Sequence, residues 1–332
     1  MAKTMRVIDI KNDVGTANSL YFTDVSRPVP SPTQALVRVK AFGINRVDIM
    51  QRDGQYPVPP QAGKIMGVEF SGIIAELGEE HETSFKIGDE VFGLAYGEYV
   101  AVSTHMLIHK PANLSWEECA GVPETWLTAA KVMYSIGEFT PGKSILWHAG
   151  ASGVSISGIQ LALANGASAV YATARSDAKC DFCIKTLGCT AAFNTTKPGW
   201  EDEVMKATGG KGVDIIADLI GPSVFAQNLK IAARDARIVL IGLMSGFIFK
   251  EEFDMGLLAF KRVRYEGSTL RSRDEPFQRK LRDTFVEHAL PKFQDGEFKV
   301  YVEKVLPWDQ IVDAHKLMES NKIMGKIICT IP

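Results

Sequence analysis

Residues 144–166 read SILWHAGASGVSISGIQLALANG, an apolar strand that runs into a turn of small residues and then into a helix. Ile145, Leu146 and Trp147 form the strand, and apolar residues after the turn repeat at helical spacing. Gly166 is expected to end this helix. Backbone N–H groups at the start of a helix bind anions, and small side chains let phosphates approach closely. The stretch therefore predicts a strand–helix unit that binds the pyrophosphate of a dinucleotide.

The turn departs from the ideal pattern of three glycines, G-x-G-x-x-G. Its three positions are Gly150, Ser152 and Ser155, so only the first is glycine. The serines are still small, and Gly153 adds backbone freedom at the start of the helix. An ordinary strand–helix corner is the alternative interpretation. In the dinucleotide interpretation, the turn residues expected to contact the cofactor are Gly150, Ser152, Gly153 and Val154.

The end of the next expected strand, residues 169–173, bears on the choice between NAD and NADP. NAD sites usually carry Asp or Glu there to bind the ribose 2′-OH. Here Arg175, Ser176 and Lys179 follow the strand, and Asp177 is the one residue of opposite charge. Two cations and a hydroxyl suit a 2′-phosphate, so these three residues favour NADPH; the alternative is a solvated helix start.

Composition limits the class of protein. The chain has 332 residues, 46% of them hydrophobic, and a formal net charge of −2. This length suggests two domains, and the charge balance argues against nucleic acid or an anionic membrane as a main partner. No apolar run approaches the roughly 20 residues that span a bilayer. Five cysteines are few and odd in number, which favours a reducing, cytoplasmic location over a disulfide framework.

The chain changes character near residue 125. Residues 1–124 contain short alternating runs broken by Gly and Pro, which is typical of an antiparallel β-barrel. Helical stretches then alternate with short apolar strands, as in a doubly wound parallel sheet. A polar helix follows over 271–288, and we expect the last strand, 325–331, to join the first domain. The predicted domains are residues 1–124 with 268–332, and residues 125–267.

Several segments together carry a resemblance to a known family. They are GINRVD at 43–48, QRDGQY at 51–56, PETWLTA at 123–129, HAGASG at 148–153, LRSRD at 270–274 and NKIMGK at 321–326. In this order they resemble the medium-chain dehydrogenase/reductase superfamily, and within it the zinc-free quinone oxidoreductases of the zeta-crystallin group. The resemblance implies an α/β chain made of a GroES-like β-barrel domain and a doubly wound Rossmann domain, usually as a homodimer.

The zinc enzymes of that superfamily provide a negative test. They carry Cys where this chain has Asn45, and a His-Glu pair where it has Val68 and Glu69. The four-cysteine lobe of those enzymes is also missing after residue 91, and Cys180 and Cys183 have no second ligand pair. We therefore expect no metal site, and a mechanism that needs no metal.

The resemblance implies further cofactor contacts. They lie on the first helix of the second domain, at the ends of two strands, at the return to the first domain and near the C-terminus: Thr128, Ile220, Gly221, Gly242, Leu243, Met244, Leu270, Arg271, Asn321 and Lys326. Without a metal, hydrogen-bond donors must stabilise the negative charge that develops on the acceptor oxygen. Tyr56 and Asn45 are the candidates for this catalytic role. A turn-packing aromatic and a turn cap are the respective alternatives.

The sequence thus predicts an NADPH-dependent reductase of quinones that works by metal-free hydride transfer. One alternative is a reductase of the C=C bond of 2-alkenals or enones, with the same fold. Another is a non-catalytic NADPH-binding protein, crystallin-like or RNA-binding, although the near-neutral charge argues against RNA. The expected partners are a small quinone or enone acceptor and a second copy of the chain, with no membrane.

Overall fold

The structure is a computed structural model that describes residues 3–59, 62–63, 65–95, 97–250 and 252–332. The chain forms two compact units. Unit 1 comprises Met1–Leu127 and Arg271–Pro332, and unit 2 comprises Thr128–Leu270. Each of these boundaries lies three residues beyond the expected one. Among the described residues, no helix is both long and apolar enough to span a membrane.

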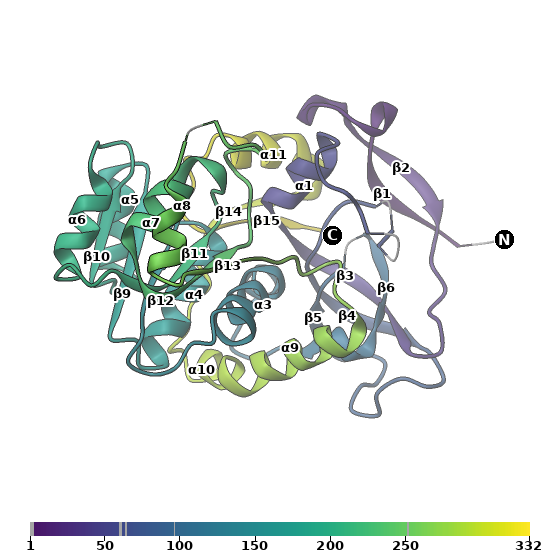
Figure 1. The fold of residues 1–332 in the computed structure, drawn as a ribbon. Helices are drawn as coiled ribbons and strands as arrows, with labels where there is room; N and C mark the ends of the chain where they lie inside the picture. The colour runs from purple at the N-terminus through teal and green to yellow at the C-terminus, as the bar shows by residue number, and fades with distance from the viewer. Residues whose placement is uncertain (1–2, 60–61, 64, 96, 251) are drawn as a thin grey trace. The chain divides into compact units, whose positions relative to one another are not determined.

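Unit 1 is built on a curled, mainly antiparallel sheet with the order β14-β15-β3-β4-β5-β7, and β6 also pairs with β3 (Figure 1). A separate hairpin, β1–β2, precedes this sheet in the sequence and was not expected. The strands of unit 1 are β1 Thr4–Ile10, β2 Leu20–Ser26, β3 Gln34–Ile44, β4 Phe70–Leu77, β5 Glu90–Gly93, β6 Tyr99–Ser103, β7 Ile108–His109, β14 Val302–Pro307 and β15 Lys326–Thr330.

The prediction that the last strand joins the first domain is confirmed. β15 pairs with β3 in antiparallel register, with Ile327 opposite Ile44 and Ile328 opposite Gly43. This pairing brings Lys326, the first residue of β15, next to the end of β3, where α1 begins. The helices of unit 1 are α1 Arg46–Arg52, α2 Trp116–Ala120, α9 Glu275–His288, α10 Leu290–Gln294 and α11 Ile311–Glu319.

Unit 2 is a doubly wound sheet of six parallel strands in the order β10-β9-β8-β11-β12-β13. Its inner strands β8, β9 and β11 are mainly apolar and buried, because helices cover both faces of such a sheet. The strands are β8 Ser144–Trp147, β9 Ala169–Ala174, β10 Ala191–Asn194, β11 Val213–Asp218, β12 Ala232–Leu240 and β13 Arg264–Gly267. The helices are α4 Gly153–Ala164, α5 Asp177–Lys185, α6 Trp200–Ala207, α7 Phe225–Ile231 and α8 Met255–Phe260.

The helix that carries Thr128 is divided in two. α3 runs over Pro123–Ala130 and continues as a π-helical turn over Lys131–Ile136. Most of the π-helical residues are buried, among them Val132, Met133 and Ile136, so this segment is too short and too uniformly buried for periodicity to reveal the change. The predicted end of α4 is confirmed: Gly166 has φ 76° and its N–H donates to the Leu163 carbonyl.

Candidate functional site

The turn after β8 is held in one conformation by its own serines. Ser152 is the N-cap of α4, and its hydroxyl accepts from the Ser155 N–H at 3.4 Å. The Ser155 hydroxyl donates in turn to the His148 carbonyl at 2.7 Å. The serine at the third glycine position therefore adds a bond across the turn, and the helix start keeps small side chains.

Gly150 is surrounded too closely for any side chain. A Cβ at this position would lie 2.7 Å from both the Ala172 Cβ and the Cys183 Sγ. The left-handed backbone conformation falls instead on Ala149, with φ 51°. Only glycine adopts that conformation without cost, so Ala149 is strained by about 1–2 kcal/mol. This cradle, formed by a bare backbone and a helix N-terminus, fits a pyrophosphate.

The end of β9 presents positive charge. Arg175 is exposed, and the Ser176 hydroxyl caps α5 by accepting from the Lys179 N–H at 3.3 Å. Asp177, the residue of opposite charge, is already paired: its carboxylate accepts from the Asn194 amide at 2.9 Å and from the Lys197 ammonium at 2.8 Å. Lys197 and Asn194 lower the Asp177 pKa, so the carboxylate stays ionised and locally neutralised.

The loops after β11 and β12 lie together at the carboxyl end of the sheet. The Met244 N–H donates to the Leu219 carbonyl at 3.3 Å, and a Cβ on Gly242 would lie 2.6 Å from the same carbonyl oxygen. The structure therefore brings together five of the expected contacts at one edge: Ile220, Gly221, Gly242, Leu243 and Met244. In open α/β sheets, ligands bind at this edge. Thr128, on α3, is buried, as is Leu270.

A buried charge cluster lies in unit 1, where β3, β4 and β15 meet. Glu69 is completely buried and Lys326 is 4% exposed. The Lys326 ammonium donates to the Glu69 carboxylate at 2.5 Å, to the Asn45 side-chain oxygen at 2.8 Å and to the Ile44 carbonyl at 3.1 Å. These three bonds use all three ammonium hydrogens. A cofactor contact by Lys326 would therefore replace one of them.

The same cluster holds Asn45 from both sides. Its amide nitrogen donates to Glu69 Oε1 at 2.8 Å and, more weakly, to the Gly43 carbonyl at 3.4 Å. The second carboxylate oxygen of Glu69 accepts from the Glu124 N–H at 2.9 Å, in the first turn of α3. Both N–H groups of the Asn45 amide thus point at protein oxygens, and Glu69 links Asn45 to the start of α3.

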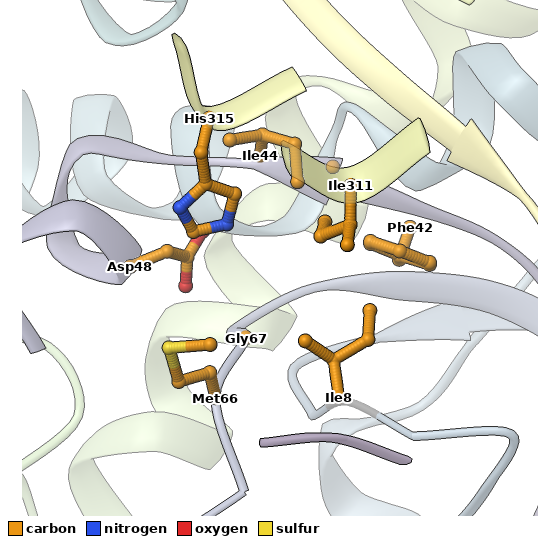
Figure 2. A pocket seen from close by; sticks show the side chains of 9 residues that line it. Ile8, Phe42, Ile44, Asp48, Met66, Gly67, Ile311 and His315 are labelled. Atoms are coloured by element: carbon orange, nitrogen blue, oxygen red, sulfur yellow. The ribbon is translucent and has the colours of Figure 1, made fainter. Parts of the chain in front are cut away.

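Asp48 is a buried acid beside this cluster. One of its oxygens accepts from the Asn45 N–H at 2.7 Å, and the other is buried with no hydrogen-bond partner among the described residues. Burial raises the Asp48 pKa to about 7, and the bond to Asn45 and the charge of Lys326 oppose this rise. Asp48 lines a cavity of about 10 Å³, close to the size of one water. Figure 2 shows His315 on the same side of this cavity as Asp48, with apolar side chains around the remainder.

Tyr56 lies in the turn that follows α1 and is half-buried. Burial raises its pKa, Glu124 adds to this, and Arg271 opposes it. Arg271 itself donates to the Gln51 side chain at 2.8 Å. The phenol is therefore protonated at neutral pH, in a position close to a guanidinium. Pro60, Gln61 and Lys64, which follow Tyr56 in the sequence, are outside the described residues.

Asn321 is the last of the expected cofactor contacts. Its side-chain oxygen accepts from the Arg46 guanidinium at 2.6 Å, and its amide donates to the Glu319 carbonyl at 2.8 Å. In this structure it joins the end of α11 to the start of α1.

Sequence reasoning missed Glu69 and Asp48 as site residues. Glu69 was noted only as part of an absent metal-ligand pair, although a carboxylate inside an apolar run already indicates a buried partner. Asp48 stands three residues after Asn45, which is the spacing of a capping box. Among the described residues, no group of three or more His, Cys, Asp or Glu side chains is placed to hold a metal ion.

Comparison with known families supports the assignment of two domain types. Residues 31–112 match the model of the alcohol dehydrogenase GroES-like domain, and residues 153–286 match that of the zinc-binding dehydrogenases. A zinc-type alcohol dehydrogenase-like protein of Schizosaccharomyces pombe is 30% identical over 91% of this chain and 92% of its own. Quinone oxidoreductase-like protein 2 of Bos taurus is 29% identical over 92% of this chain and 87% of its own.

One relative is much longer than this chain. It belongs to the phenolphthiocerol/phthiocerol polyketide synthase of Mycobacterium tuberculosis and is 26% identical over 96% of this chain, which spans only 14% of that protein's length. The similarity therefore concerns one region of a large synthase.

Solved structures agree with the arrangement described above. An NAD-dependent alcohol dehydrogenase superposes with a TM-score of 0.82 at 30% identity, covering 99% of this chain and 100% of the other. The CurK enoyl reductase superposes with a TM-score of 0.85 at 26% identity, covering 99% of both chains. The fold is therefore that of a GroES-like domain joined to a Rossmann domain, and the chain belongs to the medium-chain dehydrogenase/reductase superfamily of NAD(P)-dependent oxidoreductases.

Proposed function

We propose that this protein is an NADPH-dependent reductase that transfers hydride to quinones without a metal. The observation that carries the choice of cofactor is the end of β9. There Arg175, Ser176 and Lys179 stand where an NAD site has a carboxylate, and the carboxylate of Asp177 between them is paired with Lys197 and Asn194. Within the zeta-crystallin group, the sequence most resembles the tumour-suppressor-inducible quinone oxidoreductase, and this narrower assignment is a prediction.

In this proposal the chain's own residues bind and orient the two reactants. The turn at Gly150, Ser152, Gly153 and Val154 would hold the pyrophosphate, and Arg175 with Lys179 would hold the 2′-phosphate. Thr128, the loops after β11 and β12, Leu270, Arg271, Asn321 and Lys326 are the remaining proposed contacts. The bound nicotinamide would supply the hydride.

Tyr56 is proposed to donate a hydrogen bond to the carbonyl oxygen on which negative charge develops. Its raised pKa keeps the phenol protonated, as a donor must be. Asn45 is the second proposed catalytic residue. Because Glu69 and Gly43 accept both of its N–H groups, an acceptor oxygen would have to compete with Glu69 for the amide. We therefore assign polarisation to Tyr56 first and orientation to Asn45.

A C=C reductase of enones or 2-alkenals is the second candidate. The similarity to an enoyl reductase structure and to a polyketide synthase region favours it. The two candidates need the same donor, because both develop negative charge on a carbonyl oxygen. They differ in where the hydride is received.

A second copy of the chain is the proposed partner. β13, Arg264–Gly267, is the last strand of its sheet and pairs only with β12 among the described strands. Large apolar side chains in the sequence between β12 and β13 are exposed, among them Phe247, Ile248 and Met255. Antiparallel pairing of two copies about Tyr265 would set Arg264 of each copy against Glu266 of the other. Sedimentation at micromolar concentration tests this: a dimer is expected, and a monomer would contradict it.

The decisive experiment is a fluorescence titration of the purified chain with NADPH and NADH, followed by a turnover assay on a panel of quinones and 2-alkenals. We expect tighter binding of NADPH and oxidation of NADPH with quinones. Turnover of 2-alkenals alone would select the second candidate. Cofactor binding with no turnover on any acceptor would favour the non-catalytic alternative, and failure to bind either nucleotide would refute the proposal.

A further inference from the structure

His148 is hydrogen-bonded through every polar group that it has. Its backbone N–H donates to the Ala217 carbonyl at 3.1 Å, and its carbonyl accepts from the Ser155 hydroxyl at 2.7 Å. Its Nδ1 lies 2.8 Å from the Thr173 hydroxyl, and its Nε2 lies 2.7 Å from the Asn228 side-chain oxygen. These partners come from β11, α4, β9 and α7, so one residue joins four elements directly before the dinucleotide turn.

The bonds continue as a chain across the sheet. The Asn228 amide donates to one oxygen of Asp218 at 3.0 Å. The other oxygen of Asp218 accepts from the backbone N–H groups of Ile220 and Gly221, each at 2.8 Å. The side chains of His148, Asn228 and Asp218 are all completely buried. This series of hydrogen bonds therefore joins the turn after β8 to the loop after β11 through buried side chains alone.

The order of donors and acceptors in this series of hydrogen bonds determines which nitrogen of the His148 imidazole carries the proton. Asn228 gives its N–H to Asp218 and so offers its oxygen to His148, which must donate from Nε2. Nδ1 then accepts from the Thr173 hydroxyl. Burial lowers the His148 pKa, which keeps the ring neutral in this arrangement. The result is a single tautomer with no unpaired atom.

At both ends of this series of hydrogen bonds lies a residue with a positive φ. At one end Ala149 has a left-handed φ of 51°, and at the other Gly221 has φ 88°. Strained residues persist only where the surrounding bonds determine their conformation. His148 and the bond from the Gly150 N–H to the Thr173 carbonyl, 2.7 Å long, surround Ala149.

We propose that His148 is a positioning residue that couples the turn after β8 to the loop after β11, so that both are preformed for the dinucleotide. This inference rests on the proposed function, which assigns both segments to cofactor binding. His148 does not itself touch the cofactor in this proposal. It acts by holding Ala149 on one side and, through Asn228 and Asp218, Ile220 and Gly221 on the other.

The test compares two variants at Thr173. Thr173→Val keeps the shape of the side chain and removes the hydroxyl that donates to His148, whereas Thr173→Ser keeps the hydroxyl. Thr190→Val is the matched control, because the Thr190 hydroxyl accepts from the Val170 N–H at 3.0 Å, toward the opposite end of the same strand. The full chain is titrated with NADPH and with adenosine 2′-monophosphate, which has the 2′-phosphate but no pyrophosphate.

We expect Thr173→Val to raise the dissociation constant of NADPH about three- to tenfold, the equivalent of one hydrogen bond. Binding of adenosine 2′-monophosphate should stay within twofold, and Thr173→Ser and Thr190→Val should bind NADPH like the wild type. Equal NADPH affinity in Thr173→Val and the wild type would overturn the inference, and so would parallel losses for both ligands. A wild type that binds no NADPH would instead refute the proposed function.

A second measurement needs no variant. The ¹⁵N NMR signals of the His148 ring report its tautomer in the wild-type chain. The inference requires a neutral ring with its proton on Nε2 at pH 7. An imidazolium, or a proton on Nδ1, would contradict the bonding order from Thr173 to Asp218.

Discussion

The Lys326 ammonium lies 2.5 Å from the Glu69 carboxylate, and neither side chain is more than 5% exposed. The two residues are 257 positions apart in the sequence and meet because β15 pairs with β3. A buried pair of this kind need not add stability relative to apolar residues, but losing one partner leaves an uncompensated charge. The pair therefore makes the site of Asn45 sensitive to either partner.

Lys326→Met should destabilise the chain by about 3–5 kcal/mol, because it leaves the Glu69 carboxylate buried and unpaired. The double variant Glu69→Gln/Lys326→Met should lose less than Lys326→Met alone, since both charges disappear together. Urea unfolding at pH 7 measures this. The matched control is Lys185→Met, which breaks an exposed pair with Asp181 and should cost about 0.5 kcal/mol or less. Additive losses in the double variant would contradict the coupling.

Asp48 gives the chain a distinct pH dependence. Burial raises its pKa from 3.8 to about 7, so the folded chain binds this proton more tightly than the unfolded chain does. The stability that the protonated form contributes is complete below pH 3.8 and is lost as the pH rises to about 7, at about 1.4 kcal/mol per pKa unit. Asp48→Asn should remove this fall.

The measurement is the unfolding free energy of both chains from pH 5 to pH 8. Other groups titrate alike in the wild type and in Asp48→Asn, so the difference between the two chains reports Asp48. We expect the variant to gain stability relative to the wild type as the pH rises. A difference that is constant across this range would show that the Asp48 pKa is not raised.

The sequence predicted the elements that depend on local pattern. The strand at Ile145–Trp147, the turn at Gly150 and the helix end at Gly166 follow from periodicity and small residues that lie within 25 positions. The buried cluster could not be predicted in this way. Lys326 was expected to contact the cofactor, and nothing in the pattern indicated that its three ammonium hydrogens would bind Ile44, Asn45 and Glu69.

Long-range pairing also explains what was missed in unit 2. His148, Asn228 and Asp218 come from three separate elements, and their polar side chains meet only once β8 and β11 are neighbours. A lone histidine after an apolar strand gives no hint of such partners. The strand order that creates the contact is a property of the whole sheet, which a local window does not contain.

Tyr56→Phe should lower kcat/KM for quinones roughly tenfold or more, while the dissociation constant of NADPH stays the same. The reason is that the phenol is proposed to bind the acceptor oxygen and not the cofactor. Because burial raises the Tyr56 pKa above 10, the wild-type rate should not fall through loss of this proton below that pH. Steady-state kinetics over pH 6–9 provide the check, and unchanged turnover in the variant would reject the role.

Arg175→Ala should raise the KM of NADPH about tenfold and leave the KM of NADH unchanged, because only NADPH carries the 2′-phosphate that a guanidinium binds. Lys185→Ala, near the other end of α5, removes an exposed positive charge and serves as the control for a general electrostatic effect. Equal changes for both nucleotides, or equal effects of the two variants, would argue against a 2′-phosphate contact at Arg175.

Adding a methyl group at Gly150 should destabilise the turn, whereas removing one from the neighbouring Ala149 should stabilise it. Gly150→Ala adds a Cβ that would lie 2.7 Å from the Ala172 Cβ and the Cys183 Sγ, so the turn must shift. We expect a loss of about 1–3 kcal/mol in stability, as for an overpacked core, and weaker NADPH binding. Ala149→Gly removes the cost of the left-handed conformation at φ 51° and should stabilise the chain by up to about 1 kcal/mol.

Thermal unfolding and NADPH titration of the two variants measure both effects. The opposite signs matter, because a generally fragile turn would be destabilised by either change. If Gly150→Ala binds NADPH like the wild type, the crowding at Gly150 does not define the cradle. If Ala149→Gly is less stable than the wild type, Ala149 is not strained in the folded chain, and the hydrogen bonds of His148 do not hold it in a costly conformation.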